Sequence, residues 1–405
     1  MKLCIHKSAL GTSRHFVFDG SEFELVGSIP CDAWVYGLQG QHIKSVEPIF
    51  EILGEKILFP IDSRYRKPWE ISKLSKQVNW SRALPNTVFK SQLQKLVDQL
   101  WIILSSFGGT YYLNEFYVIR KLLFGLSRAK IDSNKLKKLQ TNCKSASISS
   151  SLQKFSPNAE GFSSVPVYSQ TSTISGRLTV DKGPNILTLK KEYRSIIKSR
   201  YENGKIISVD FSSLEPRVLI EHNGTSCKDD IYSFISESVF NSTLSRDISK
   251  KLTLGVLYGL GTTKFSEVIT DASIEEIQGY TNKIRDFFKI KSLERSLSSN
   301  MSDGMIENIF GRKVPVKGDP MYIVVNRFIQ SSAADAALLS FSYLCDQIED
   351  RNLDALPIFL IHDAVIFDVH PESIDRFNQI VSDRLWVPKF NKKFPISCEI
   401  LSTNF

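Results

Sequence analysis

The sequence predicts a fold of the α+β class, divided into several subdomains. Residues 1–80 contain short β-like runs separated by turn residues, and residues 88–143 carry apolar side chains at the three- and four-residue spacing of helices. Beyond Tyr168, strand-like and helix-like segments alternate to the end. A chain of 405 residues with 42% hydrophobic content can fill more than one core, so about two to four subdomains are expected.

Composition narrows the class of protein and its setting. The formal net charge of +8 suits a polyanionic partner, because lysine and arginine displace counterions condensed on phosphates, although many basic proteins bind no nucleic acid. The six cysteines form no C-x-x-C pair, which argues against a zinc ribbon or a disulfide framework and favours a reducing, intracellular setting. No apolar run is long enough for a signal peptide or a membrane span, so we expect a soluble protein that is not secreted and has no membrane partner.

The first part of the chain divides into three stretches. The runs HFVFDG, EFELVG, AWVYGL and KILFPI predict strands of a small N-terminal sheet. The segments VFKSQLQKLVDQLWIILSSF and NEFYVIRKLLFGLSRAK predict two long helices. The stretch NKLKKLQTNCKSASISSSLQKFSPNAEGFSS is typical of a loop with a basic face, and a solvated linker is an equally good interpretation of it.

An acid closes a predicted strand in the second half of the chain. The run KIISVDF, residues 205–211, is β-branched and apolar and delivers Asp210 to its carboxyl end. A helical segment, SSLEPRVLIEH, follows at once. In it Ser212 and Glu215 have the spacing of a capping box, and Pro216 falls in the first helical turn. On these residues alone, a turn aspartate followed by a helix cap is the commoner interpretation.

A second acid occupies the turn of a predicted hairpin. The segment FLIHDAVIFDV, residues 359–369, consists of two apolar runs broken by His362 and Asp363. A carboxylate between buried strands is costly unless its charge is compensated, and a divalent metal ion compensates it. If Asp210 and Asp363 meet, hard cations with oxygen ligands relieve their repulsion and activate an oxygen nucleophile.

A third segment, SRDISKKLTLGVLYGLG, combines cations and apolar groups along one predicted helix. Four residues at four-residue intervals fall on one broad side of it: Arg246, Lys250, Leu254 and Tyr258. A ligand with a phosphate tail and a base suits this order, and a surface helix with one buried end is the alternative. Gly255, Gly259 and Gly261 weaken a helix, so we expect them to allow close approach of a backbone or ligand.

Taken together, these segments resemble motifs A, B and C of the family A DNA polymerases in order and spacing. DFSSLEPRVLIEH resembles motif A, RDISKKLTLGVLYG motif B and LIHDAVIFDV motif C, and SGRLTVDKGPN, IENIFGRKVPV and NRFIQSSAADAALLSF resemble three further segments of the family. The resemblance covers roughly residues 170–405. It implies a right-hand polymerase fold with an antiparallel-sheet palm, helical fingers and a helical thumb, plus a small N-terminal region.

The resemblance also implies where each subdomain lies. The expected divisions are a small N-terminal region of unknown role at 1–85, the thumb at 86–168, the first part of the palm at 169–235, the fingers at 236–318 and the second part of the palm at 319–405.

By the same resemblance, the chain is a template-directed DNA polymerase that adds deoxynucleotides to a primer 3'-hydroxyl. Asp210 and Asp363 would hold two Mg²⁺ ions, for which Mn²⁺ can substitute, with the backbone carbonyl of Phe211 as a further ligand. The implied nucleotide-binding residues are Arg246, Lys250, Leu254, Tyr258, Glu215 and Tyr232. The implied contacts to primer–template DNA are Arg177, Asn326, Gln330, His362 and Arg217.

Several of these roles are specific. Arg246 and Lys250 would bind the triphosphate of the incoming dNTP, and Tyr258 would lie near the templating base. Glu215 would block a ribose 2'-hydroxyl, which makes deoxynucleotides the expected substrate.

The chain departs from the family pattern at three of its positions. Leu254 replaces the usual phenylalanine or tyrosine, so dideoxynucleotides should be poorly accepted. Ala364 replaces an auxiliary glutamate after the motif C aspartate, which affects metal tuning more than activity. Tyr232 replaces a histidine that contacts phosphate, and a phenol can donate a hydrogen bond but carries no positive charge.

No 3'–5' proofreading is expected, because Asp19 and Glu22 in FDGSE lack the D-x-E spacing of the family's exonuclease. A separate exonuclease or processivity factor is therefore a candidate partner for residues 1–80. The resemblance favours replication or repair in the cytoplasm of a bacterial or phage-infected cell. Two alternatives stay open: a polymerase that copies RNA, and an inactive DNA-binding scaffold that keeps the fold.

Overall fold

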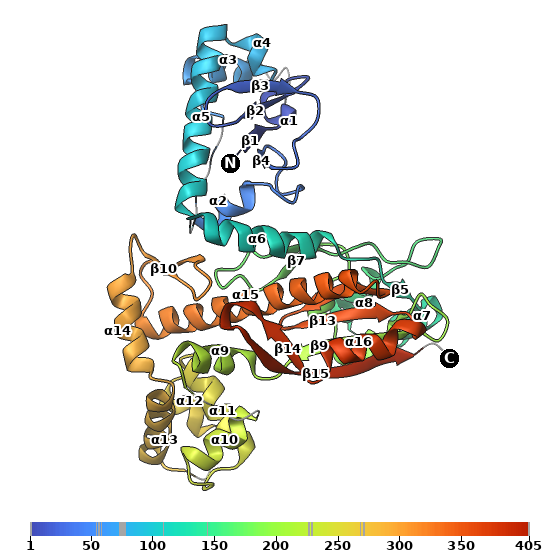
Figure 1. Cartoon of the computed structure of the whole chain (residues 1–405), viewed down its shortest axis with the longest axis vertical. Coiled ribbons are helices and arrows are strands. Elements are labelled where there is room, and N and C mark those ends of the chain that lie inside the picture. Colours follow the sequence, from blue (N-terminus) through green and yellow to red (C-terminus); the bar gives the residue numbers. More distant parts are fainter. Residues whose placement is uncertain are drawn as a thin grey trace. The chain divides into compact units, whose positions relative to one another are not determined.

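The computed structural model describes residues 2–53, 55, 57, 59–72, 78–107, 109–143, 145–225, 227, 230–267, 269 and 272–403. The chain forms two compact units, Met1–Arg120 and Lys121–Phe405 (Figure 1). The division falls inside the predicted thumb, residues 86–168, so this segment contributes to both units. The subdomain assignment itself stays a prediction.

The amino-terminal unit is built on a four-stranded sheet with the order β3-β2-β1-β4. Its strands are β1 (Lys2–Ile5), β2 (His15–Phe18), β3 (Phe23–Val26) and β4 (Ala33–Tyr36). β1 pairs antiparallel with β2 and parallel with β4, and Cys4, Val17, Ala33 and Val35 form a core on this sheet. The expected small sheet is confirmed, although sequence reasoning missed β1. In KILFPI the described residues form no strand, and Lys56 and Leu58 lie outside the described residues.

Helices complete this unit. They are α1 (Lys7–Leu10), α2 (Glu47–Leu53), α3 (Ser63–Ser72), α4 (Trp80–Ala83), α5 (Asn86–Ser106) and α6 (Gly109–Phe124), the last of which crosses into the second unit. The two long helices predicted from spacing are thus confirmed. Buried Phe89, Leu93, Leu96 and Leu100 form the apolar stripe of α5.

The second unit begins with a segment that sequence reasoning described wrongly. Its elements are β5 (Lys130–Ile131), α7 (Ser133–Asn142), α8 (Ala146–Gln153), β6 (Val167–Ser169), β7 (Thr179–Lys182), β8 (Ile197–Lys198) and two 3₁₀ turns, η1 (Ile186–Thr188) and η2 (Lys191–Ile196). The expected loop therefore contains two helices. Asp132 caps α7 by accepting from Lys135 N at 3.0 Å, and Leu136, Leu152 and Phe155 are buried. These few apolar residues suffice to fold a stretch dominated by lysine and serine.

The central sheet of the second unit is antiparallel throughout, with the order β12-β13-β9-β15-β14. Its strands are β9 (Lys205–Phe211), β12 (Ala355–Ile361), β13 (Ala364–Val369), β14 (Arg384–Val387) and β15 (Lys392–Thr403). The predicted strand and the predicted hairpin are both confirmed, and they are neighbours in the sheet. The sheet packs with α15 (Met321–Asp350), and α16 (Ile374–Val381) follows β13 with η3 (Pro371–Ser373) between them (Figure 1).

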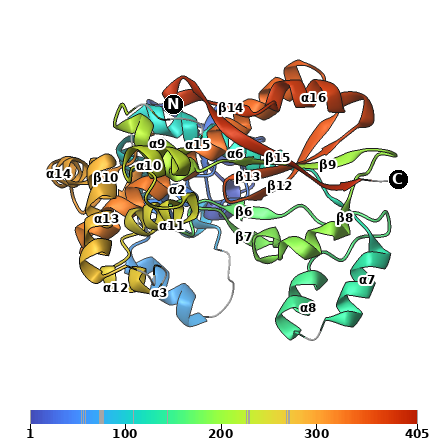
Figure 2. The same cartoon turned by 90° about the horizontal axis from the view of Figure 1, so that it is seen from below.

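The rest of the second unit is mostly helical. It contains α9 (Leu214–His222), α10 (Ile231–Ser238), α11 (Arg246–Leu257), α12 (Thr262–Ser266), α13 (Ile274–Phe287), α14 (Ile290–Asn300), the hairpin of β10 (Met305–Glu307) and β11 (Lys313–Pro315), and η4 (Pro388–Phe390) near the end. Helices α10 to α13 gather at one end of the unit, whereas α7 and α8 lie at another (Figure 2). The α+β class is confirmed. No helix in the described part of the chain is long and apolar enough to cross a membrane.

Candidate active site

The two acids singled out by the sequence meet at one end of the central sheet. Asp210 lies near the end of β9 and pairs across the sheet with Ala364, the first residue of β13. The backbone N–H of Phe211 donates to the carbonyl of Asp363 at 3.1 Å. His362 takes a left-handed conformation, with φ at 52°, and makes the tight turn between β12 and β13. The turn thereby brings Asp363 beside the end of β9.

Burial and nearby negative charge disfavour the charged forms of these acids. Burial, with the charge of Asp363 as the second cause, raises the pKa of Asp210 to about 7, while Lys191 and Arg194 oppose the shift. Burial also raises the pKa of Asp363, and Glu215 adds to that shift. Among the described residues, no group of three or more His, Cys, Asp or Glu side chains forms a metal site. Two adjacent carboxylates with unfavourable negative charge are nevertheless a donor set that suits hard divalent cations.

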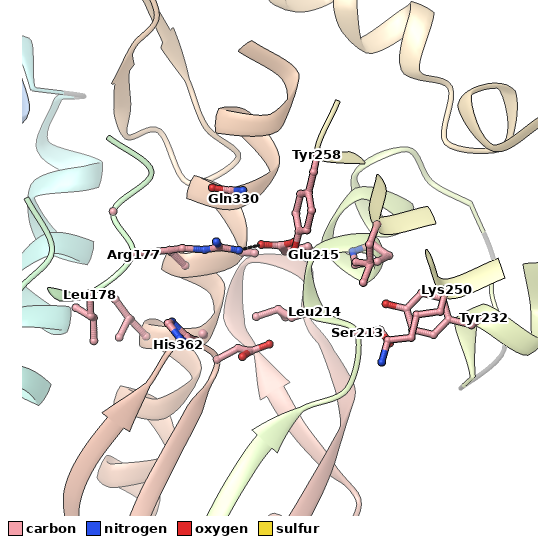
Figure 3. A pocket seen from close by; sticks show the side chains of 18 residues that line it. Arg177, Leu178, Ser213, Leu214, Glu215, Tyr232, Lys250, Tyr258, Gln330 and His362 are labelled. Carbon is pink, nitrogen blue, oxygen red and sulfur yellow. Dashed lines mark hydrogen bonds and ion pairs between the residues drawn. The ribbon is translucent and has the colours of Figure 1, made fainter. Parts of the chain in front are cut away.

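A cavity of about 360 Å³ opens beside Asp363. Figure 3 shows the side chains that line it. The predicted site residues that line it are Arg177, Glu215, Tyr232, Lys250, Leu254, Tyr258, Gln330, His362 and Asp363. They come from six separate stretches of sequence. Asp210, Phe211, Arg217, Arg246 and Asn326 are outside its lining.

Glu215 faces this cavity and does not cap its helix as expected. Ser213, not Ser212, is the N-cap of α9; its φ is 58° and its side chain makes no capping hydrogen bond. The carboxylate of Glu215 forms an ion pair with Arg177, and its Oε2 accepts a hydrogen bond from the Tyr258 hydroxyl at 2.5 Å (Figure 3). The capping box is therefore wrong, because charged and phenolic partners from other segments hold the carboxylate.

Two cationic side chains of helix α11 lie near the ring of Tyr232. Ser245 caps this helix by accepting from Ile248 N at 3.3 Å. Lys250 Nζ lies 5.7 Å from the centre of the Tyr232 ring, and the Arg246 guanidinium lies 5.8 Å from it. Arg246 Nε also lies 2.6 Å from Asp230. Lys250 faces the cavity with Leu254 and Tyr258, while Arg246 is held outside its lining.

The glycines at the end of α11 serve packing within the protein. A Cβ on Gly255 would lie 2.3 Å from the ring of Phe265, and one on Gly259, whose φ is +71°, would lie 2.5 Å from the ring of Tyr322. Gly255 and Gly259 thus allow the close approach of side chains of the same chain, and not of a backbone or ligand as expected. At Gly261 no described atom lies within 4 Å of such a Cβ.

The expected DNA contacts are dispersed. Arg177, Gln330 and His362 line the cavity. Asn326 donates from Nδ2 to the carbonyl of Leu257 at 3.2 Å. Arg217 is only 6% exposed, and its guanidinium lies 6.0 Å from the centre of the Phe394 ring. In this structure, Arg217 is thus buried against an aromatic side chain.

Sequence reasoning missed a buried polar network next to the cavity. Arg312 and Asp335 form an ion pair whose side chains are 2% and 0% exposed. Asp335 also accepts from Gln170 at 2.7 Å and from Asn308 at 2.6 Å. The signal available in the sequence was an aspartate within the otherwise apolar and small helix segment SSAADAALLSF.

The fold of this chain is that of a polymerase domain. It is similar to the POL domain of Pol1 from M. smegmatis, solved in complex with DNA primer-template and dNTP, with a TM-score of 0.61 and 14% identity over 87% of this chain and 80% of that one.

Residues 114–404, more than half of the chain, match the model of DNA polymerase family A, so the chain belongs to this family. It is 20% identical to DNA polymerase I of Aquifex aeolicus, over 64% of this chain and 46% of the relative. It is 24% identical to the thermostable DNA polymerase I of Thermus thermophilus, over 50% of this chain and 27% of the relative. The chain thus spans less than half the length of these relatives.

Proposed function

We propose that this chain is a template-directed DNA polymerase that joins deoxynucleotides to the 3'-hydroxyl of a primer. One observation carries the proposal above all. Asp210 and Asp363, from separate segments, lie together at the end of the central sheet, beside a cavity walled by Lys250 and Tyr258. Carboxylates for divalent ions next to a cation for a triphosphate are the parts that nucleotidyl transfer needs. Membership of DNA polymerase family A supports the same reaction.

The carboxylates of Asp210 and Asp363, with the carbonyl of Phe211, would hold two Mg²⁺ ions or Mn²⁺ in their place. When bound, such ions lower the pKa of the primer hydroxyl and balance the charge of the phosphates. The chain's own residues position the nucleotide. Lys250 attracts the triphosphate into the cavity, and Tyr232 offers a phenol beside it.

We assign the sugar and base ends of the nucleotide to Glu215, Leu254 and Tyr258. Glu215, fixed between Arg177 and Tyr258, would meet a ribose 2'-hydroxyl and so favour dNTPs. Leu254 would lie against the sugar, and Tyr258 near the templating base. Arg246, now paired with Asp230, would have to leave that partner to reach a triphosphate.

Primer–template DNA would run past Arg177, Gln330 and His362, with Asn326 nearby. Arg217 would reach DNA only after leaving the ring of Phe394. We retain the proposed subdomains, in which α9 and the central sheet belong to the palm and α10 to α13 to the fingers.

Proofreading, partners and location belong to the same proposal. Asp19 accepts hydrogen bonds from the backbone N–H groups of Ser21 and Glu22 in an exposed turn between β2 and β3. The Asp19 carboxylate thus closes a turn, and Glu22 lies in the same turn without the spacing of the family's exonuclease, so we expect no proofreading from these two acids. We propose a separate exonuclease or processivity factor as a partner of the amino-terminal unit, and replication or repair in the cytoplasm of a bacterial or phage-infected cell.

Extension of a labelled primer on a DNA template with Mg²⁺ and dNTPs tests the proposal. We expect the wild type to extend with dNTPs and not with rNTPs, and Asp363→Asn to bind the same duplex without extending it. Asp383→Asn, at a side chain 81% exposed, is the matched control and should extend normally. An RNA template in a parallel reaction distinguishes a polymerase that copies RNA. Tight duplex binding without extension by the wild type would favour the inactive scaffold.

A further inference from the structure

The Arg312–Asp335 pair lies directly beneath the segment that carries Arg177. Arg312 Nη2 donates to the carbonyl of Ser175 at 2.6 Å and to that of Ser331 at 3.3 Å. Gly176 has a φ of +70°, and a Cβ there would lie 1.6 Å from Arg312 Nη1. The guanidinium therefore packs on the backbone of Gly176, where only glycine leaves room for it.

Asp335 makes this arrangement possible in the interior. Its carboxylate lies 3.2 Å from Arg312 Nε and compensates a charge that is almost wholly buried. The same carboxylate accepts from the side chains of Gln170 and Asn308, so both of its oxygens are hydrogen-bonded. Asn308 in turn accepts from the backbone N–H of Arg312 at 2.9 Å. The network thus joins α15, the β10–β11 hairpin and the segment before β7 at one point.

The segment held by this network ends at the cavity. Thr173 closes a turn by accepting from Gly176 N at 3.0 Å, and its hydroxyl donates to the carbonyl of Arg177 at 2.8 Å. The Arg177 side chain then pairs with Glu215, which also holds the Tyr258 hydroxyl. A continuous series of polar contacts therefore runs from buried Asp335 to the carboxylate that faces the nucleotide.

We propose that Asp335 and Arg312 are positioning residues for sugar selection: they fix the backbone of residues 175–177, so that Arg177 holds Glu215 where a ribose 2'-hydroxyl would lie. This inference rests on the proposed function, and it adds a part of the machinery that touches no substrate. A network that only stabilised the fold would affect unfolding without affecting the choice between deoxyribose and ribose.

The test compares buried ion pairs inside and outside this network. Asp335→Asn leaves Arg312 without its counter-charge, and Arg312→Lys keeps the charge but loses the planar contacts to Ser175 and Gly176. Asp368→Asn is the matched control. Asp368 is also 0% exposed and ion-paired, with Arg200 Nε at 3.0 Å, but it lies near the end of β13 that is remote from Asp363.

Selectivity is measured as the ratio of kcat/KM for a dNTP to that for the matching rNTP. Asp335→Asn and Arg312→Lys should each lower this ratio on the order of tenfold, because small displacements at a reacting centre have effects of this size or larger. Asp368→Asn should lower the melting temperature without changing the ratio. If both network variants keep the wild-type ratio while their melting temperatures fall, the network is structural only and the inference is overturned.

Hydrogen exchange gives a second measure that needs no catalysis. Backbone amides of residues 171–178 should exchange faster in Asp335→Asn and Arg312→Lys than in the wild type, and at the wild-type rate in Asp368→Asn. Unchanged exchange in both network variants would contradict the positioning role. A wild-type chain that extends no primer would instead contradict the proposed function, and the exchange measurement would still decide whether Asp335 holds the Arg177 segment.

Discussion

The Tyr258 hydroxyl donates a hydrogen bond to Oε2 of Glu215 at 2.5 Å, which connects the end of α11 with the first turn of α9. Glu215 is also the ion-pair partner of Arg177. Two residues from distant parts of the chain thus fix one carboxylate in the wall of the cavity. The same carboxylate has to stay in place for it to exclude a 2'-hydroxyl.

Tyr258→Phe should therefore weaken sugar discrimination. It removes one of the two partners of Glu215 among the described residues but keeps the ring and its packing, so dNTP incorporation should change little. Incorporation of rNTPs should rise by roughly tenfold or more, because a hydrogen bond to a charged group contributes about 1.5–3 kcal/mol. Competition between a dNTP and the matching rNTP on one template measures this. Tyr322→Phe, in a ring that packs on Gly259, is the control and should leave the ratio unchanged.

Asp210→Asn should abolish extension and stabilise the metal-free protein at neutral pH. The ordinary pKa of this carboxyl is 3.8, and in the fold it is raised to about 7. Between these values the folded chain binds more protons than the unfolded chain, so the free energy of unfolding falls as pH rises from about 4 to 7, by at most about 1.4 kcal/mol per pH unit. Asparagine has no proton to lose, so the variant should lack this slope.

Urea unfolding in a metal chelator at pH 5 and pH 8 measures that difference. At pH 8 the free energy of unfolding of the variant should exceed that of the wild type. Saturating Mg²⁺ should reduce this difference, because it binds the wild-type carboxylates. Asp383→Asn controls for the loss of one negative charge at an exposed position. Equal pH slopes for Asp210→Asn and the wild type would show that burial beside Asp363 carries no such cost.

Leu254→Tyr should improve the use of dideoxynucleotides. Leu254 lines the cavity between Lys250 and Tyr258, and a phenol there could hydrogen-bond to the triphosphate when the sugar lacks its 3'-hydroxyl. The ratio of chain termination to extension at one template position should rise at least several-fold. Leu254→Met keeps an apolar side chain of similar volume and should retain the wild-type ratio. The same terminator ratio in Leu254→Tyr and Leu254→Met would mean that this position does not face the sugar.

Gly255→Ala should destabilise the protein by about 1–3 kcal/mol through overpacking, because the added methyl group meets the ring of Phe265. Thermal unfolding measures the loss. Phe265→Leu in the same chain should relieve the clash. The double variant should therefore lose less free energy of unfolding than the two single variants lose in sum. Gly261→Ala, where no described atom lies near the added group, should shift the melting temperature much less. Additive losses for Gly255→Ala and Phe265→Leu would contradict this packing.

Much of the local structure was predictable because it depends on neighbouring residues. The β-branched run ending at Asp210 and the paired apolar runs around Asp363 identified a strand and a hairpin, and both are present. Helical spacing identified α5, α6 and α11 for the same reason. The lysine- and serine-rich stretch was wrongly predicted as a loop. It forms two helices, because a few buried side chains such as Leu136 and Leu152 outweigh its polar composition.

Partners that are distant in sequence were not predictable. Nothing near Glu215 in the sequence indicates that Arg177 and Tyr258 will take its carboxylate in place of a helix cap. The residues around Gly255 do not indicate that the ring of Phe265 will pack against it. Those around Arg312 do not indicate that its guanidinium will pack on Gly176. Each depends on how separate elements pack, which spacing along one element does not encode.

The strand, hairpin and helix that carry Asp210, Asp363 and Lys250 are predictable from the sequence, because hydrophobic periodicity and turn chemistry act over a few residues. Three other features depend on tertiary packing: Asp210 and Asp363 share one end of a sheet, Arg246 is held by Asp230, and Asp335 and Arg312 lie under the segment that carries Arg177. Those outcomes follow from strand register and from the need of every buried charge for a partner, and both are properties of the packed chain.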